Sequence, residues 1–385
     1  MARNSRLSQA KNAKNDEFYT QMADIVKEVQ SYLEFDPNVF KGKTILCPCD
    51  DPYESNFFKY FALKFNDYKI KKLIATCYVD SPIANTQLSL FAHEPVEDRT
   101  TKAPHKIEVT EVDDYNRDGA VDLLDVQWLL ENKKNALTRL EGDGDFRSEE
   151  IKKLRDEADI IITNPPFSLF REFLAWIIEV KKQFLIIGNM NAVTNKEMFP
   201  LIQENIVWFG ATIHSGDREF RVPDYYPLQA AGFRVDENGI KYIRVKGVRW
   251  FTNLDHGRRH QPIAFMTMEK NLKFSKHKEI RGKKNYSKYD NYDAIEVPYT
   301  SAIPSDYDGI MGVPVSFLDK YCPEQFEIIW QASGNTRASA PKEVLKKLHY
   351  KQHHEDRGGC CVINGKRTYS RIFIRKKNEN RIKEI

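Results

Sequence analysis

The sequence lacks the features of several protein classes. Its 385 residues contain no run of about 18 apolar residues, the length that a helix needs to cross a membrane. The polar start Met1-Ala2-Arg3-Asn4 carries no apolar segment for secretion. The six cysteines form no Cys-x-x-Cys pair, so neither a zinc ribbon nor a disulfide scaffold is expected. We therefore expect a cytoplasmic protein with no membrane association.

Net charge is also low, at +4, but it is unevenly distributed. Residues 271–385 contain 22 Lys and Arg against 14 Asp and Glu, whereas the rest of the chain contains 37 against 41. A basic C-terminal part attached to a near-neutral body predicts a module that binds a polyanion. We expect a catalytic domain at 1–270 and a basic target-recognition domain at 271–385.

One stretch, residues 158–167, predicts the reactive centre. β-Favouring residues run directly into Asn164-Pro165-Pro166-Phe167, and an apolar periodic run typical of a helix follows. The prolines end the strand at the edge where open α/β sheets bind ligands. The Asn164 side-chain oxygen and the Pro165 carbonyl can accept hydrogen bonds from the amine of a base, and Phe167 can stack on its ring. The alternative is a plain strand–turn–helix junction. The pattern resembles the catalytic motif of amino-group methyltransferases that use S-adenosylmethionine.

Acidic strand ends supply candidate contacts to that cofactor. The first predicted strand ends in Asp50 and Asp51, which suit an ammonium group, although no glycine occurs between Gly42 and Gly119 to form the usual glycine-rich turn. The second predicted strand ends in Asp80, and a carboxylate there commonly accepts from ribose hydroxyls. The alternatives are a helix cap for the first pair and a turn acid for Asp80.

Two segments with aromatic residues are further candidates. Phe18-Tyr19-Thr20 could hold the methionine end of the cofactor, or Thr20 could simply cap the predicted helix that follows. In Gly142–Ser148, Asp145 could accept from the adenine amino group while Phe146 packs on its ring. The alternative for this second segment is a glycine turn and a helix cap.

An acidic segment follows the spacing of a calcium loop, with Gly119 at the sharp turn. The predicted ligands are Asp114, Asn116, Asp118, Asp122 and Asp125. Aspartate replaces the usual glutamate at the twelfth position, and no clear helix precedes the loop. We expect a structural Ca²⁺ site in an insertion at 106–130, and the alternative is an acidic turn that caps the helix Leu123–Leu130.

The order of the predicted elements indicates an α/β fold. Strands and helices alternate to about residue 213, and two late strands follow. This order predicts a Rossmann-like, seven-stranded and mostly parallel sheet with an antiparallel edge, the fold of class I S-adenosylmethionine-dependent methyltransferases.

Several motifs together resemble those of EcoRI-type adenine-specific DNA methyltransferases, over most of residues 10–320. They are Asp16–Gln21, Asp50-Asp51-Pro52, Ser55–Phe61, Gly142–Ser148, Asn164–Phe167 and Trp250–His256. The resemblance implies N6 methylation of an adenine flipped out of double-stranded DNA, in a restriction–modification or orphan setting. A separately encoded restriction endonuclease is then a candidate partner, and the nucleoid of a prokaryote or phage-infected cell is the expected location. Methylation of RNA adenine or protein glutamine and a catalytically silent DNA-binding protein are the alternatives.

Overall fold

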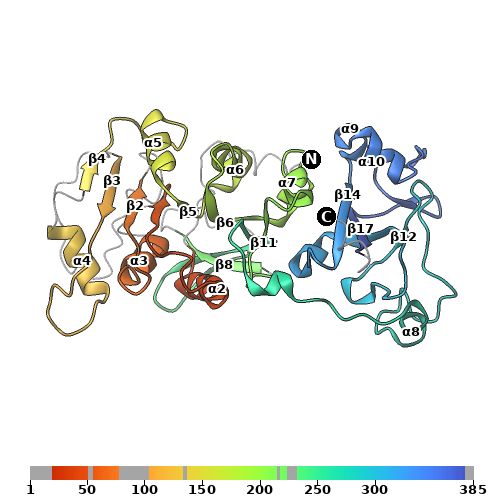
Figure 1. Ribbon diagram of the computed structural model, residues 1–385, viewed down its shortest axis with the longest axis horizontal. Helices are drawn as coiled ribbons and strands as arrows, with labels where there is room; N and C mark the ends of the chain where they lie inside the picture. Colours follow the sequence, from red (N-terminus) through yellow and green to blue (C-terminus); the bar gives the residue numbers. More distant parts are fainter. Residues whose placement is uncertain are drawn as a thin grey trace. The chain divides into compact units, whose positions relative to one another are not determined.

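The computed structural model of the chain describes residues 20–50, 55–77, 104–132, 137–214, 217–222 and 232–377. The chain divides into two compact units (Figure 1). The first consists of Met1–Met190 and Ser215–Asp255, and the second of Asn191–His214 and His256–Ile385. The predicted boundary at residue 270 separates a catalytic part from a DNA-recognition part, and this functional boundary stays a prediction.

A parallel sheet forms the centre of the first unit. Its central strands are β1 (Thr44–Cys47), β2 (Lys72–Thr76), β5 (Ile160–Thr163) and β6 (Gln183–Asn189), in the order β2-β1-β5-β6. All three pairs that they form are parallel, and every residue of β1 and β5 is buried. Burial on both faces explains why these strands are nearly continuous apolar runs in the sequence. The predicted α/β class with a large, mostly parallel sheet is confirmed.

Antiparallel strands flank this parallel centre. β3 (His105–Val109) pairs with β2 and is followed by β4 (Leu137–Arg139), while β11 (Val248–Thr252) pairs with β6. A separate antiparallel sheet contains β8 (Asp217–Arg221), β10 (Lys241–Lys246) and β9 (Phe233–Val235), in that order. The predicted antiparallel edge is therefore present.

Helices connect the parallel strands of the first unit. α3 (Asn56–Leu63) joins β1 to β2, α5 (Glu149–Glu157) leads into β5, and α6 (Phe170–Ile178) joins β5 to β6. The two crossovers leave the middle of the sheet in opposite directions, so right-handed connections place α3 and α6 on opposite faces. Figure 1 shows α2 (Met22–Phe35) and α3 on one side of the sheet and α5 and α6 on the other. α4 (Leu123–Asn132) lies between β3 and β4 in the chain.

The strand order reverses between β1 and β5. From β1 the chain continues to β2 on one side, and from β5 it continues to β6 on the other. Open α/β sheets bind ligands outside the carboxyl ends of the strands at such a reversal. Asp50 and Asn164 follow the two strands at this edge, so the topology brings two of the predicted site residues to the expected place.

The second unit has its own sheet, in the order β12-β13-β17-β14. β17 (Arg371–Lys376) runs antiparallel to both β13 (Met311–Pro314) and β14 (Phe326–Ala332), and β12 (Ile295–Glu296) pairs with β13. The remaining elements are η2 (Met190–Thr194), α7 (Phe199–Gln203), β7 (Trp208–Phe209), η3 (Gly257–His260), α8 (Met268–Phe274), η4 (Thr300–Ala302), η5 (Val315–Lys320), α9 (Thr336–Ser339), α10 (Lys342–Lys347), β15 (Val362–Ile363) and β16 (Lys366–Arg367). Among the described residues, no helix combines the length and apolar character that crossing a membrane requires.

Candidate active site

The turn after β5 carries the predicted catalytic segment. Asn164, Pro165 and Pro166 are buried, and Phe167 is half-buried. Pro166 has φ −53° and ψ 125°, and the 3-10 turn η1 (Phe167–Leu169) then leads into α6. The strand, turn and helix predicted here are confirmed. The segment therefore lies at the carboxyl edge of the sheet, with its backbone direction fixed by two prolines.

The start of α6 is held against the sheet, and this contact orients the turn. The Phe170 ring packs on Phe251 of β11, with ring centroids 4.9 Å apart. Gly188 of β6 makes room for it, since a Cβ atom there would overlap the Phe170 ring. The glycine therefore has a packing role that places the catalytic segment.

Asp50 is a buried carboxylate that ties three elements together. The Ser55 hydroxyl, at the N-terminus of α3, donates to its Oδ1 at 2.6 Å. The Thr163 hydroxyl, at the end of β5, donates to its Oδ2 and lies 2.5 Å from the carbonyl oxygen of Pro48. The Asp50 N–H donates to the carbonyl of Thr76 at the end of β2. The Asp50 carboxylate is thus held in place by Thr163, the residue that precedes Asn164 in the chain.

The turn before Asp50 is sharp although it contains no glycine. Cys49 has φ 66°, in the left-handed region that residues with a side chain rarely adopt. Cys47 ends β1 and is fully buried. Its burial, and then the charge of Asp50, raise the pKa of the Cys47 thiol well above its usual value, so this thiol packs as a neutral group.

Two buried hydroxyls lie beside these elements. The carbonyl of Thr20 accepts a hydrogen bond from Nδ2 of Asn56, the first residue of α3, at 2.7 Å. Thr76 ends β2, next to the turn that contains Asp50. Within the described part of the chain, neither threonine hydroxyl has a hydrogen-bond partner, and both residues are buried. Buried polar groups are nearly always paired, so these are groups that a bound ligand would satisfy.

The Asp145–Phe146 segment contacts α6 through the Phe146 ring. The Asp145 carboxylate accepts from Nε and Nη2 of Arg147 at 2.8 and 2.6 Å. This interaction raises the pKa of the Arg147 guanidinium. Phe146 is buried edge-on against Phe173 and Trp176, at centroid distances of 5.1 and 5.6 Å. Phe146 therefore has a core contact, and contacts of this pair with adenine stay a prediction.

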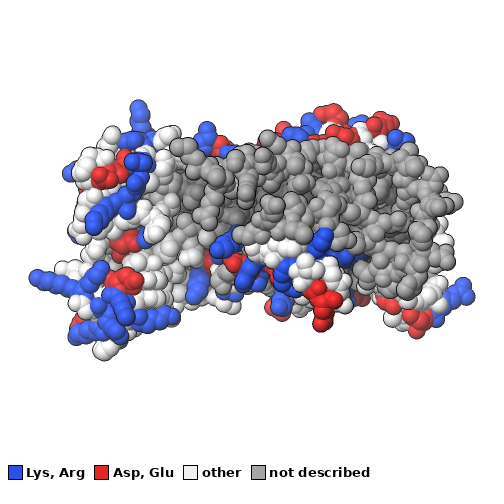
Figure 2. Space-filling model, turned by 180° about the vertical axis from the view of Figure 1, so that it is seen from behind, with Lys and Arg blue, Asp and Glu red and all other residues white. Residues whose placement is uncertain are grey.

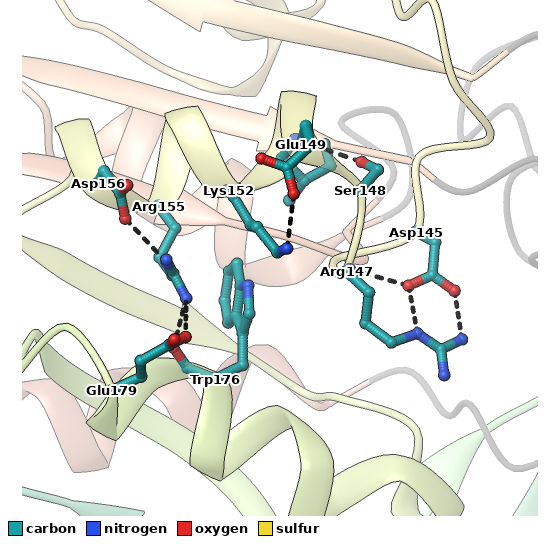
Figure 3. Close-up of polar contacts among 10 residues, drawn as sticks. Asp145, Arg147, Ser148, Glu149, Lys152, Arg155, Asp156, Trp176 and Glu179 are labelled. Atoms are coloured by element: carbon teal, nitrogen blue, oxygen red, sulfur yellow. Dashed lines mark hydrogen bonds and ion pairs between the residues drawn. The ribbon is translucent and has the colours of Figure 1, made fainter.

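The same region fixes α5 to α6. Ser148 caps α5 by accepting from the N–H of Ile151, which confirms the predicted helix start. Arg155 donates to the carbonyl of Trp176 at 2.9 Å and pairs with Glu179 at 3.0 Å (Figure 3). These contacts hold the Gly142–Ser148 segment near the helix that follows the catalytic turn.

The acidic loop at 114–125 forms a helix cap. Asp122 accepts from the N–H of Leu124 at 2.7 Å, and Asp125 accepts from the N–H of Asp122 at 2.9 Å, a reciprocal capping box. The donors, first of all the Asp122 N–H, lower the pKa of Asp125. Asp114 accepts from two further backbone N–H groups of the loop. Among the described residues, no group of three His, Cys, Asp or Glu side chains is arranged to hold a metal ion. The structure therefore does not support the predicted calcium site, whose expected ligands also included Asn116 and Asp118.

Four predicted cofactor residues lie outside the described residues: Phe18, Tyr19, Asp51 and Asp80. The structure adds Ser55, Thr76 and Thr163, which were not among the predicted site residues. Ser55 had a local signal, because a serine before an apolar run is a typical helix cap. Thr163 had none, since its partner Asp50 is 113 positions away.

A parallel α/β sheet with Asn-Pro-Pro-Phe after one central strand and a fixed carboxylate after its neighbour is characteristic of an amino-group methyltransferase. The model of the family "Adenine-specific methyltransferase EcoRI" matches residues 6–377. The chain belongs to this family, and it is an adenine-specific DNA methyltransferase.

Three relatives agree over almost their whole length. The Type II methyltransferase M.EcoRI of Escherichia coli is 39% identical over 376 residues, covering 98% of both chains. The Type II methyltransferases M.MpnI of Mycoplasma pneumoniae and M.MgeORF184P of Mycoplasma genitalium are each 34% identical, over 96% of this chain and 98% of theirs. No solved structure shows a significant match to the chain.

Proposed function

We propose that the protein transfers a methyl group from S-adenosylmethionine to N6 of an adenine flipped out of double-stranded DNA. The observation that carries this proposal is that Asp50 and Asn164 follow neighbouring strands at the reversal of strand order, where the hydroxyl of Thr163, next to Asn164 in the chain, donates to Asp50. A cofactor site and a base site must adjoin for direct methyl transfer, and these residues follow neighbouring strands. The Rossmann-like, seven-stranded class is part of the same proposal.

The family implies S-adenosylmethionine, and the first unit has groups that fit it. The Asp50 carboxylate accepts from the hydroxyls of Ser55 and Thr163, and a carboxylate is a suitable partner for an ammonium group. The buried hydroxyls of Thr20 and Thr76 offer hydrogen bonds that no described residue uses. When bound, the cofactor supplies an electrophilic methyl group. We assign its binding to Thr20 and Asp50, together with Phe18, Tyr19, Asp51, Asp80, Asp145 and Phe146.

The catalytic segment would act by positioning the adenine amine. The side-chain oxygen of Asn164 and the carbonyl of Pro165 accept its two hydrogens, so the nitrogen lone pair points away from them. Phe167, which is half-buried, is available to stack on the ring, and Pro166 keeps the turn rigid. Positive charge grows on the nitrogen during attack, and these two oxygens stabilise it. No base is needed before the attack, because the proton can leave afterwards.

Recognition of the DNA is assigned to residues 271–385, where the basic excess lies. Flipping one base costs a few kcal/mol, which stacking and contacts with the DNA backbone can offset. A restriction–modification setting, with a separately encoded endonuclease as partner and a prokaryotic nucleoid as location, belongs to this proposal. The Type II names of the relatives support it.

Methyl transfer with labelled cofactor tests the function directly. The purified protein is incubated with labelled S-adenosylmethionine and unmethylated duplex DNA, and the label is mapped by base. We expect label on adenine N6, and a rate lower by about 10²–10³-fold in Asn164→Ala, because a preorganised acceptor of developing charge is lost. Asn132→Ala is the matched control, since Asn132 is an exposed residue at the end of α4.

Cofactor binding separates the possible failures. Asn164→Ala should bind S-adenosylmethionine as the wild type does, because Asn164 is assigned to the base and not to the cofactor. Transfer to RNA or to protein, with none to DNA, would contradict the proposal. Equal activity of Asn164→Ala and Asn132→Ala would contradict the assigned role of the turn.

A further inference from the structure

The second unit carries a concentrated group of cations on and after α8. They are Lys270, Lys273, Lys276, Lys278, Arg281, Lys283 and Lys284, and all are exposed. We call this group the basic surface 270–284. Only two carboxylates, Glu269 and Glu279, occur in the same stretch. Figure 2 shows Lys and Arg side chains gathered at the lower left, where α8 lies in this view, with few acidic side chains among them.

Most of these cations have no acidic partner. Lys273 pairs with Glu269 at 2.6 Å, across one helical turn. Within the described part of the chain, the other six form no ion pair. In the first unit, by contrast, Lys72 pairs with both Glu108 and Glu157 at 2.6 and 2.9 Å. Most of the positive charge on the basic surface 270–284 is thus not neutralised by ion pairs within the described part of the chain.

The backbone beneath these cations is firmly anchored. Asn271, Ser275 and Ile280 are buried between the exposed positions. The Tyr286 hydroxyl donates to the carbonyl of Ala302 at 2.6 Å. The N–H of Gly282 also donates to the carbonyl of Leu272, which closes the segment into a loop. Anchored cations lose little backbone freedom on binding, so the surface is preorganised for a polyanion.

Two contacts of His277 extend this anchoring. His277 stacks on Tyr299 with ring centroids 3.6 Å apart and planes 4° apart. Its Nε2 also lies 3.0 Å from Oγ of Ser301. Phe274, in contrast, is 71% exposed in the middle of the basic surface 270–284. An exposed aromatic ring among cations suits the sugar and base faces of a nucleic acid.

We propose that the basic surface 270–284 binds the phosphate backbone of duplex DNA without reading its sequence. The inference rests on the proposed function and locates one DNA contact within it. Crowded, unpaired cations repel one another, and a line of phosphates relieves this repulsion. Release of the counterions condensed on DNA provides the favourable free energy. Lysine ammonium groups on flexible stems suit phosphates, whereas base edges require fixed bidentate donors.

A triple variant tests the surface against a matched control. The variant is Lys276→Gln/Lys278→Gln/Lys283→Gln. The control, Lys41→Gln/Lys71→Gln/Lys153→Gln, removes the same charge from exposed lysines outside residues 271–385. Dissociation constants are measured over a series of salt concentrations, with a duplex that carries the methylated sequence found by label mapping and with one that lacks it.

We expect the slope of log K against log salt to become shallower by about 0.9 for each lost phosphate contact, or roughly 2–3 for the triple variant. The affinity should fall by the same factor for both duplexes, because a phosphate contact carries no sequence information. The rate at saturating DNA should stay at the wild-type value. Thermal unfolding of both variants shows that they are folded.

Three results would overturn the inference. They are an unchanged slope, an equal slope change in the control, and a loss confined to the duplex with the methylated sequence. Failure of the proposed function can be distinguished from failure of this inference, because in the first case the wild-type protein would transfer no methyl group to DNA. A wild type that methylates DNA, beside a triple variant with the wild-type slope, refutes only the role of the basic surface 270–284.

Discussion

Replacing Thr163 by valine tests whether one hydroxyl holds the candidate active site together. Thr163 is fully buried at the end of β5, and valine keeps its shape while removing the hydroxyl. The change removes the hydroxyl that donates to Oδ2 of Asp50 and lies 2.5 Å from the carbonyl oxygen of Pro48, while Ser55 still donates to Oδ1. The perturbation is therefore confined to one side of the carboxylate.

The cost follows from the loss of a donor to buried acceptors. Leaving a buried acceptor unsatisfied costs about 1–3 kcal/mol, and a charged acceptor lies at the upper end. We expect Thr163→Val to lower the free energy of unfolding by about 2–3 kcal/mol, which for a unit of this size lowers Tm by roughly 4–12 °C. Because the Asp50 carboxylate is then less fixed, we expect about tenfold weaker binding of S-adenosylmethionine, which corresponds to about 1.4 kcal/mol.

Calorimetry measures both quantities, by thermal unfolding and by titration with the cofactor. Thr163→Ser is the control, because it restores the hydroxyl and removes only a methyl group. It should recover cofactor binding, although its stability should fall by about 0.8 kcal/mol for the lost buried carbon. If Thr163→Val unfolds and binds the cofactor like the wild type, the hydroxyl does not position Asp50 and the reasoning fails.

Three other changes have definite expected outcomes. Thr20→Val should leave the unliganded protein as stable as the wild type or more so, because the buried Thr20 hydroxyl has no partner among the described residues. The rise in Tm on adding S-adenosylmethionine should nevertheless be smaller than in the wild type. An undiminished rise would show that Thr20 is not part of the cofactor site. Cys49→Gly should unfold in urea within about 1 kcal/mol of the wild type, because glycine accepts φ 66° without the strain that cysteine already bears but costs backbone entropy. Cys49→Val should lose roughly 1–2 kcal/mol, because a β-branched side chain adds crowding at this φ; equal loss in both would argue against strain. Asp125→Ala should lower Tm by removing half of the capping box, and Ca²⁺ or a chelator should not change the Tm of the wild type; a clear rise with Ca²⁺ would restore the calcium site.

Local sequence patterns predicted the elements that depend on neighbouring residues. The strand before Asn164, the turn at Pro165 and Pro166, and the helix that follows are all present. The Ser148 cap of α5 is present as well. In each case the deciding interactions lie within a few residues, as strand propensity, proline geometry and capping hydrogen bonds do.

Where a local sequence pattern is compatible with two structures, the sequence alone does not show which of them forms. The spacing from Asp114 to Asp125 suits both a calcium loop and a helix cap, because both use closely spaced carboxylates. In the folded chain Asp125 accepts from backbone N–H groups, and this decides for the cap. Phe146 likewise suits a ligand contact or a core position; it packs on Phe173, and its contact with adenine stays a prediction.

The sequence alone determined the α/β class, the strand, turn and helix around Asn164 and the basic excess in residues 271–385, since each depends on adjacent residues or on composition. Only the tertiary structure decided that the Thr163 hydroxyl reaches Asp50 and that Cys49 makes the sharp turn without glycine. It also decided that six of the seven exposed cations on and after α8 form no ion pair with the described residues. These depend on which strands become neighbours and which surfaces are buried. Strand neighbours and buried surfaces are both determined by the free energy of packing the whole chain, which cannot be read from any short stretch of sequence.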